Sequence, residues 1–237
     1  MVKSAATIVL VHGAWADGSS WNKVIPLLLA KNMQVIAVQL PLTSVEDDLV
    51  ATNRIIADTE KPIVLVGHSW GGMAVTQAGN DPKVMALVYV SAFAPDVGET
   101  GSSLIGAHPA PPALSTIVTD SAGFVYQTVD GMLKNIAPDL PVEEARALVV
   151  TQGRPAGKAF GQTARRHRCL EGEALLVHRN NRRSRGQRGA SEGRSQSNGS
   201  QDHRDSIEPH VAALASGRSR RCYRGCCRHG RNLNGHP

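Results

Sequence analysis

The chain has 237 residues, a net charge of +6 and 41% hydrophobic residues. That length suits one α/β domain of ordinary size, and that apolar fraction excludes a wholly disordered protein. No run approaches the roughly 18 apolar residues that a membrane helix needs, and no signal-peptide cleavage site follows the first apolar run. We therefore expect a cytoplasmic protein with no membrane contact.

The charge is unevenly distributed. Residues 1–163 contain 10 Lys and Arg against 14 Asp and Glu, a net charge of −4, whereas residues 164–237 contain 16 against 6, a net charge of +10. The second segment has no Lys, all four Cys and a single aromatic residue, Tyr223. Such a composition buries too little apolar area to offset the entropy of ordering. We expect residues 164–237 to form a disordered Arg- and Cys-rich tail without strands.

The segment before this tail alternates between two kinds of pattern. Apolar, β-branched runs typical of buried parallel strands alternate with helix-length segments, which predicts βαβ units, a mainly parallel sheet and flanking helices. The predicted strands are residues 7–11, 35–38, 63–66 and 86–90, and the predicted helices are residues 21–32, 45–59 and 73–80.

The pattern changes at Pro95, after the fourth predicted strand. Prolines and short amphipathic stretches follow, which favours a small helical lid. The sequence thus predicts a core over residues 1–94, a lid over residues 95–163 and the tail over residues 164–237.

The most informative motif is Gly67-His68-Ser69-Trp70-Gly71, between the third predicted strand and a helix. It fits G-x-S-x-G, the nucleophile elbow, which projects a serine hydroxyl above the sheet. Ser69 is the candidate nucleophile, and side chains at Gly67 and Gly71 would collide with backbone in so tight a turn. A Gly- and Ser-rich connecting turn is the alternative. Dinucleotide binding is a poor rival, because no G-x-G-x-x-G occurs in the required context.

A second motif, His12-Gly13-Ala14-Trp15, follows the first predicted strand. Acyl transfer needs two N–H donors for the developing oxyanion, and elbow enzymes take one from this loop and one from the residue after the nucleophile. The candidate donors are the main-chain N–H groups of Ala14 and Trp70. We interpret His12 as a residue that holds the loop by hydrogen bonding rather than as a proton-transfer group.

Residues 5 to about 163 resemble the α/β-hydrolase superfamily and, within it, the small esterase group related to plant methylesterases and hydroxynitrile lyases. The matching pieces are residues 9–15, 64–72 and 87–96. The lyases commonly have Thr after the His of the first motif, where this chain has Gly13. The resemblance implies a serine esterase that cleaves small esters through an acyl-enzyme on Ser69, with no metal and no cofactor.

The resemblance also implies a general-base His and an orienting Asp or Glu, in loops after the last two strands. Those loops should fall within residues 175–215, where neither group is recognisable, and the fold looks truncated before its last two strands. The tail offers Asp202 or Asp205 as an acid and His210 as a base. These residues are too close in sequence to lie in two successive strand-end loops. We therefore expect the chain as written to be nearly inactive.

The genetic code suggests that the missing residues are encoded in a shifted reading frame. With degenerate bases left open and codons read one base later, residues 171–178 permit Lys-Ala-Lys-Pro-Ser-Trp-Tyr-Ile, which resembles the family's penultimate strand. The same frame permits Asp-Arg-Ala-Val near Ser184 and a His codon straddling Pro209 and His210, as in the family's acid and histidine loops. Our hypothesis is that the reading frame is lost near residues 162–166.

The tail has two other interpretations. A non-catalytic hydrolase-fold protein could use it to bind nucleic acid, but the absence of Lys and of interleaved aromatic residues disfavours a nucleic-acid partner. A metal site is disfavoured because Cys222, Cys226, Cys227 and His229 lack the paired spacing of zinc ligands. The expected partner is a small ester. The sequence does not indicate which oligomeric state the protein adopts.

Overall fold

The computed structural model describes residues 6–163 and the backbone of residues 175–178. A parallel sheet of five strands, in the order β2-β1-β3-β4-β7, forms the centre of this part. The strands are β1 (Thr7–Val11), β2 (Gln34–Val38), β3 (Ile63–His68), β4 (Val84–Val90) and β7 (Leu175–His178). All four strands predicted within residues 1–94 are confirmed, with boundaries that shift by two residues at most.

The helices that connect these strands differ more from the prediction. The segment predicted as one helix over residues 21–32 is a 3-10 turn, η1 (Gly18–Trp21), followed by α1 (Ile25–Ala30), because Asp17 caps the first element and Pro26 starts the second. The next two helices, α2 (Val45–Ala57) and α3 (Gly71–Ala78), lie close to their predicted positions and pack against each other.

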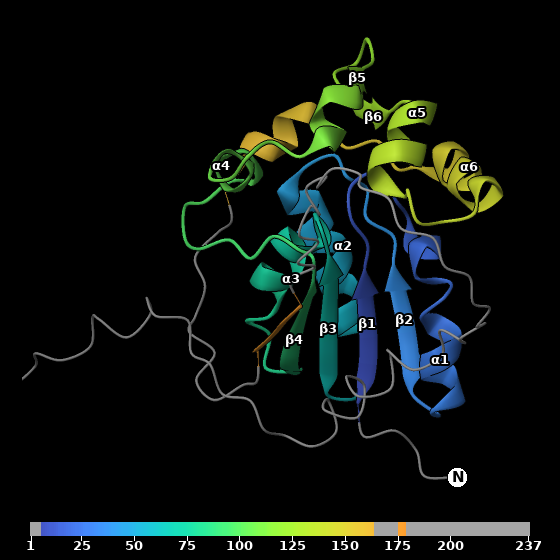
Figure 1. Ribbon diagram of the computed structural model, residues 1–237. Coiled ribbons are helices and arrows are strands. Elements are labelled where there is room, and N and C mark those ends of the chain that lie inside the picture. Colours follow the sequence, from blue (N-terminus) through green and yellow to red (C-terminus); the bar gives the residue numbers. More distant parts are fainter. Residues whose placement is uncertain (1–5, 164–174, 179–237) are drawn as a thin grey trace, which may run out of the picture.

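The lid lies above the carboxyl ends of the strands (Figure 1). Its short helical elements are α4 (Gly101–Gly106), η2 (Pro112–Thr116), α5 (Val129–Gly131), η3 (Met132–Ile136), α6 (Val142–Thr151) and η4 (Gly157–Gly161). It also contains an antiparallel hairpin, β5 (Ile117–Thr119) with β6 (Val125–Gln127). The lid is thus mainly helical, as the sequence predicts, with a short hairpin in addition: β-branched and aromatic residues flank a turn in which the Asp120 carboxylate accepts from the Phe124 N–H.

A correction concerns the tail. Its composition predicts no strand after residue 163, but β7 pairs in parallel with β4, with Leu175 opposite Leu87 and His178 opposite Val90. Three consecutive apolar residues begin β7, and the edge of β4 offers unpaired backbone groups that a further strand can satisfy. The expected disorder of the remaining tail concerns residues outside the described part.

The core lies between the sheet and the two helices α2 and α3. Alternate residues of β1 and β3 point into it, since Val9, Val11, Ile63 and Leu65 are fully buried. The buried part of α3 is nearly continuous, and this places its first turn against the carboxyl ends of β1 and β3. The core thus fixes the position of the turn between β3 and α3.

Candidate active site

Ser69 occupies the turn between β3 and α3 in a strained conformation. Its φ is +49°, a left-handed value that residues other than glycine rarely adopt. Three main-chain hydrogen bonds hold it: the Ser69 N–H donates to the Val90 carbonyl (3.4 Å), and the Ser69 carbonyl accepts from the N–H groups of Gly72 (3.1 Å) and Phe93 (3.0 Å). The side chain stays partly exposed. This geometry matches the strained strand-to-helix turn that the motif predicts.

The two glycines of the motif allow close approach of neighbouring atoms. A Cβ at Gly67 would lie 2.7 Å from Cγ2 of Val75, and one at Gly71 would lie 2.6 Å from the main-chain oxygens of both Val11 and His12. Neither glycine has a positive φ. These positions therefore require glycine because it has no side chain, and not because of its backbone conformation. The first turn of α3 consequently packs directly on the end of β1.

The loop after β1 lies against this turn. A Cβ at Gly13 would lie 2.9 Å from Cβ of Ser69, so the loop that carries Ala14 borders the serine. Trp70 follows Ser69 in the sequence, and its main-chain N–H lies at the amino end of α3. The structure thus brings together the Ala14 loop, Ser69 and Trp70, as the sequence predicts. A helix amino terminus at this point favours negative charge.

His12 holds this loop with both ring nitrogens. Nδ1 lies 2.8 Å from the Gly13 carbonyl, and Nε2 accepts from the Leu40 N–H at 3.0 Å, which together require a neutral ring protonated on Nδ1. Burial lowers the pKa of His12, in agreement with the neutral form. The interpretation of His12 as a loop-holding residue is confirmed.

The Trp70 side chain is anchored by an unpredicted residue, Asp48. The Trp70 indole is buried, packs against Phe160 with ring centroids 4.7 Å apart, and donates from Nε1 to Oδ2 of Asp48 at 2.7 Å. The other carboxylate oxygen, Oδ1, accepts from the Leu42 N–H at 2.8 Å. Burial raises the pKa of Asp48 to about 6, although both hydrogen bonds act in the opposite direction.

The sequence contains a signal for Asp48 that motif searching does not use. The buried residues of α2 recur at intervals of three and four, and they are Val45, Asp48, Thr52 and Ile56. An acidic residue on the buried face of an amphipathic helix requires hydrogen-bond partners, and this position could have been identified on that ground.

The remaining aromatic side chains of the site are Trp15 and Trp21. Trp15 stacks on Phe160 at 6.2 Å, and Trp21 meets the His68 ring edge-on at the same distance. Burial lowers the pKa of His68 and so favours the neutral form of its ring. The indole N–H groups of Trp15 and Trp21 are buried and have no acceptor among the described residues. They are donors that a ligand oxygen could use.

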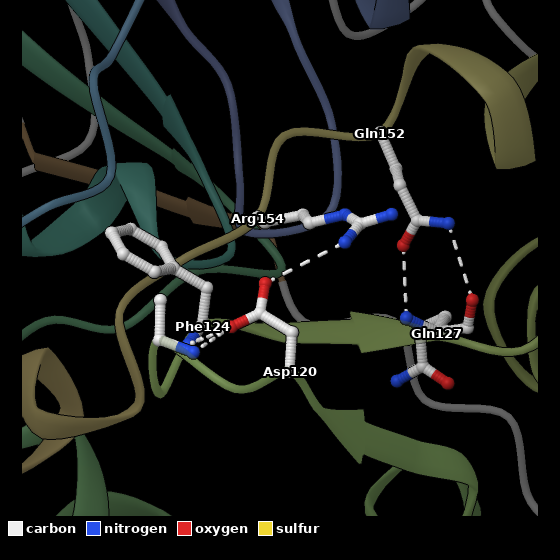
Figure 2. Close-up of polar contacts among 6 residues, drawn as sticks. Asp120, Phe124, Gln127, Gln152 and Arg154 are labelled. Carbon is white, nitrogen blue, oxygen red and sulfur yellow. Dashed lines mark hydrogen bonds and ion pairs between the residues drawn. The ribbon is translucent and has the colours of Figure 1, made fainter.

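The lid has its own network of polar contacts (Figure 2). The Gln152 side chain bonds to the main chain of Gln127 in both directions, while Arg154 lies 3.5 Å from Asp120 and over the Tyr126 ring. A cavity of about 390 Å³ lies beside this network, and none of its lining residues belongs to the Ser69 turn or the Ala14 loop. The lining residues are Thr43, Ala122, Gly123, Phe124, Ala156 and Lys158.

Within residues 6–163, no group of three His, Cys, Asp or Glu side chains could hold a metal ion. In the same part of the chain, no helix has the length and apolar character that crossing a bilayer demands. The positions at which the shifted frame offers an acid and a histidine, and the alternatives Asp202, Asp205 and His210, lie outside the described residues. The described site therefore comprises a nucleophile and two oxyanion donors as candidates.

Comparison with known proteins agrees with this arrangement. A family described as "Alpha/beta hydrolase family" matches residues 8–216, a span that continues past residue 163. Salicylic acid-binding protein 2 of Nicotiana tabacum is 34% identical over 110 residues, which cover 40% of this chain and 42% of that protein. A carbendazim hydrolyzing esterase of Nocardioides sp. is 32% identical over 114 residues, 42% of this chain and 47% of that enzyme. The matched regions thus span less than half the length of these relatives.

Solved structures show the same fold at lower identity. Tomato methylketone synthase I superimposes with a TM-score of 0.62 and 18% identity, over 75% of this chain and 78% of that one. A pyrethroid hydrolase from Sphingobium faniae superimposes with a TM-score of 0.55 and 23% identity, over 69% and 73% of the two chains. These neighbours establish an α/β-hydrolase fold for the core and lid.

Proposed function

Because this chain belongs to the α/β-hydrolase family, we propose that it derives from a serine hydrolase of the carboxylesterase type, which cleaves small esters through an acyl-enzyme on Ser69. The observation that carries the proposal is the strained conformation of Ser69, at φ +49°, between β3 and α3 and against the Gly13 loop. Proteins retain such strain where the surrounding structure enforces it, commonly at active sites.

The proposed reaction has two stages. The Ser69 hydroxyl loses its proton to a general base and its oxygen attacks the ester carbonyl carbon, which places a negative charge on the carbonyl oxygen. The main-chain N–H groups of Ala14 and Trp70 stabilise that charge. The C–O bond of the ester breaks, and the alcohol leaves with the proton from the base. Water then attacks the acyl-enzyme, which releases the carboxylic acid and regenerates Ser69.

The relatives support this chemistry at the level of the bond cleaved. They include an enzyme named carbendazim hydrolyzing esterase and Methylesterase 2 of Arabidopsis thaliana, 32% identical over 115 residues. Gly13, in the position where the lyases commonly have Thr, favours ester hydrolysis over cyanohydrin cleavage. A small ester is the substrate class that we propose.

We further propose that the general base and its acid are encoded in the shifted frame and are missing from the chain as written. The position of β7 supports this proposal, because residues 175–178 form the strand beside β4 and lie within the interval whose shifted codons resemble the family's penultimate strand. A one-base shift leaves the spacing along the chain unchanged, so a strand at this position agrees with the shifted match. Resequencing the gene across codons 160–237 tests the proposal directly.

The role of Ser69 is tested by covalent labelling with a small fluorophosphonate. Ser69 should form the phosphonyl ester with loss of fluoride, slowly in the absence of its base, and peptide mass spectrometry should locate the label on Ser69. The Ser69→Ala variant is the control and should take up none. Labelling elsewhere on the chain, at the same rate in this variant, would contradict the proposal. Salt-dependent RNA binding by an unreactive chain would instead support the non-catalytic alternative.

A further inference from the structure

Asp48 connects three parts of the molecule that meet at the proposed oxyanion site. It lies on α2, its Oδ1 accepts from the Leu42 N–H after β2, and its Oδ2 accepts from the Trp70 indole at the start of α3. The Leu42 carbonyl in turn accepts from the Ala156 N–H of the lid at 2.8 Å. One carboxyl group thus links the elbow, a strand-end loop and, through that loop, the lid.

Burying the Asp48 carboxyl group costs free energy. Asp48 is 1% exposed, and a buried carboxylate is unfavourable unless hydrogen bonds and charges compensate. Its two partners are uncharged donors, and the charged neighbour whose field acts on it is Asp47, which further opposes ionisation. Asp47 is itself hydrogen-bonded to Thr43 and Ser44 and lies in the field of Lys158. No cation neutralises Asp48 among the contacts described.

The partner of Asp48 explains why the group is placed there. Trp70 immediately follows the nucleophile, and its main-chain N–H is one of the two proposed oxyanion donors. The aromatic rings of Phe93 and Phe160 pack against its indole, and Asp48 supplies the directional contact that fixes the rotation of the ring within this packing. Because the indole is buried and packed against both rings, a displacement of the ring would shift the Trp70 Cα and the main-chain N–H attached to it.

We propose that Asp48 is a positioning residue, which holds the Trp70 side chain so that the Trp70 main-chain N–H stays directed at the oxyanion. The catalytic consequence of this inference rests on the proposed function. The positioning of Trp70 by Asp48 does not. Donors in an oxyanion hole act through preorganisation, so a small displacement of one donor lowers reactivity.

Nuclear magnetic resonance of the 237-residue chain, labelled with ¹⁵N on both tryptophan nitrogens, tests the structural step. The chain has three Trp, so each spectrum contains three indole and three main-chain signals, which single Trp→Phe variants assign. Both Trp70 signals should move together as pH is raised through about 6, where Asp48 ionises, while the signals of Trp15, whose ring stacks on Phe160, stay constant. The Asp48→Asn variant should displace both Trp70 signals and abolish their shared titration.

Several results would overturn the proposal. An indole signal of Trp70 that titrates while its main-chain signal stays fixed would reduce Asp48 to a packing contact. A Trp70 indole that does not titrate in the unmodified chain would exclude the contact itself. If Asp48→Asn prevents folding, the signals of Trp15 and Trp21 also move to the positions of an unfolded chain. The titration of the Trp70 signals in the unmodified chain then tests the proposal alone.

The catalytic consequence is measured separately through Ser69. Asp48→Asn should slow fluorophosphonate labelling about tenfold, less than the roughly 10²–10³-fold effect of deleting an oxyanion donor. The matched control is Asp58→Asn, the same change of side chain at an exposed position at the far end of α2, which should leave the rate unchanged. Absence of labelling in every variant, together with the expected Trp70 titration, would count against the nucleophile and leave the positioning contact intact. Equal rates in a reactive chain and its Asp48→Asn variant would overturn the positioning role.

Discussion

At the scale of single residues, Gly71 limits what the site tolerates. In Gly71→Ala the new methyl group would lie 2.6 Å from two main-chain oxygens at the end of β1. Backbone at the centre of a sheet cannot retreat easily, so we expect a loss of about 2–3 kcal/mol in the free energy of unfolding, measured in urea. Gly106→Ala in α4 is the control, because its new methyl group would have no atom within 4 Å, and it should leave stability unchanged or raise it by up to about 1 kcal/mol. Equal losses would contradict the steric explanation.

Asp48 should make stability depend on pH. Its pKa rises from 3.8 to about 6 on folding, so the folded chain binds the proton more tightly than the unfolded chain does. The contribution of Asp48 to the free energy of unfolding is therefore largest below pH 3.8, falls through the window up to about pH 6 and then stays level, with a total loss of about 3 kcal/mol. Unfolding of the wild type and Asp48→Asn at several pH values isolates this contribution, and a difference that is constant across the window would refute it.

Residue roles can be predicted where a motif fixes both residue type and context. Ser69 has such a motif, and the place of His12 directly after β1 indicates its loop-holding role. The helical pattern indicates that Asp48 is buried, but its partners, Leu42 and Trp70, escape prediction because they come from segments whose approach depends on how α2 packs against α3.

At the scale of elements, Lys83 stabilises the end of α2 from a distance in sequence. Its Nζ donates to the carbonyls of Ile56, Ala57 and Thr59, at 3.2, 2.9 and 2.9 Å, where the last turn has unsatisfied acceptors and negative dipole charge. Lys83→Met should lower the free energy of unfolding by about 1–2 kcal/mol in urea. Lys31→Met, at an exposed position after α1, should change it little, and comparable effects would indicate a general charge effect.

The lid depends on a pair of side-chain contacts that imitate strand pairing. Gln152 accepts from the Gln127 N–H at 2.8 Å and donates to the Gln127 carbonyl at 3.1 Å (Figure 2). Gln152→Leu should free the hairpin from the end of α6 at a cost of about 1–2 kcal/mol and accelerate proteolysis between residues 117 and 152. The exposed neighbour Thr151→Ala is the control. Cleavage that spreads equally into the sheet would show that the lid and core unfold together.

Elements follow from the sequence to the extent that each has a continuous pattern. Buried parallel strands are apolar runs, so β1 to β4 are predictable to within two residues of their ends. The hairpin of β5 and β6 is not, because strands of three residues carry no period that distinguishes them from a loop. The same holds for β7, whose apolar run is equally short and lies in an Arg-rich context.

At the scale of the whole molecule, the two compositions of the chain meet where the hydrolase pattern stops. The acidic segment up to residue 163 contains the core, the lid and the proposed nucleophile, and the sequence alone predicts all three. The base and its acid cannot be predicted from the residues as written, because the loops that should carry them lie in a segment whose composition has no strand period and no family motif.

Restoring the shifted frame tests the molecule as a whole. A gene corrected near codons 162–166 should encode an Asp and a His in the order that the family requires after Ser69. Because triad members act as a unit, the corrected protein should react with a fluorophosphonate at least about 10³-fold faster than the 237-residue chain, and should hydrolyse a small aryl ester with a burst of alcohol release. Ser69→Ala in the corrected protein should remove both activities. If the corrected protein folds and reacts no faster than the chain as written, the shifted matches are coincidental and the site lacks its base for another reason.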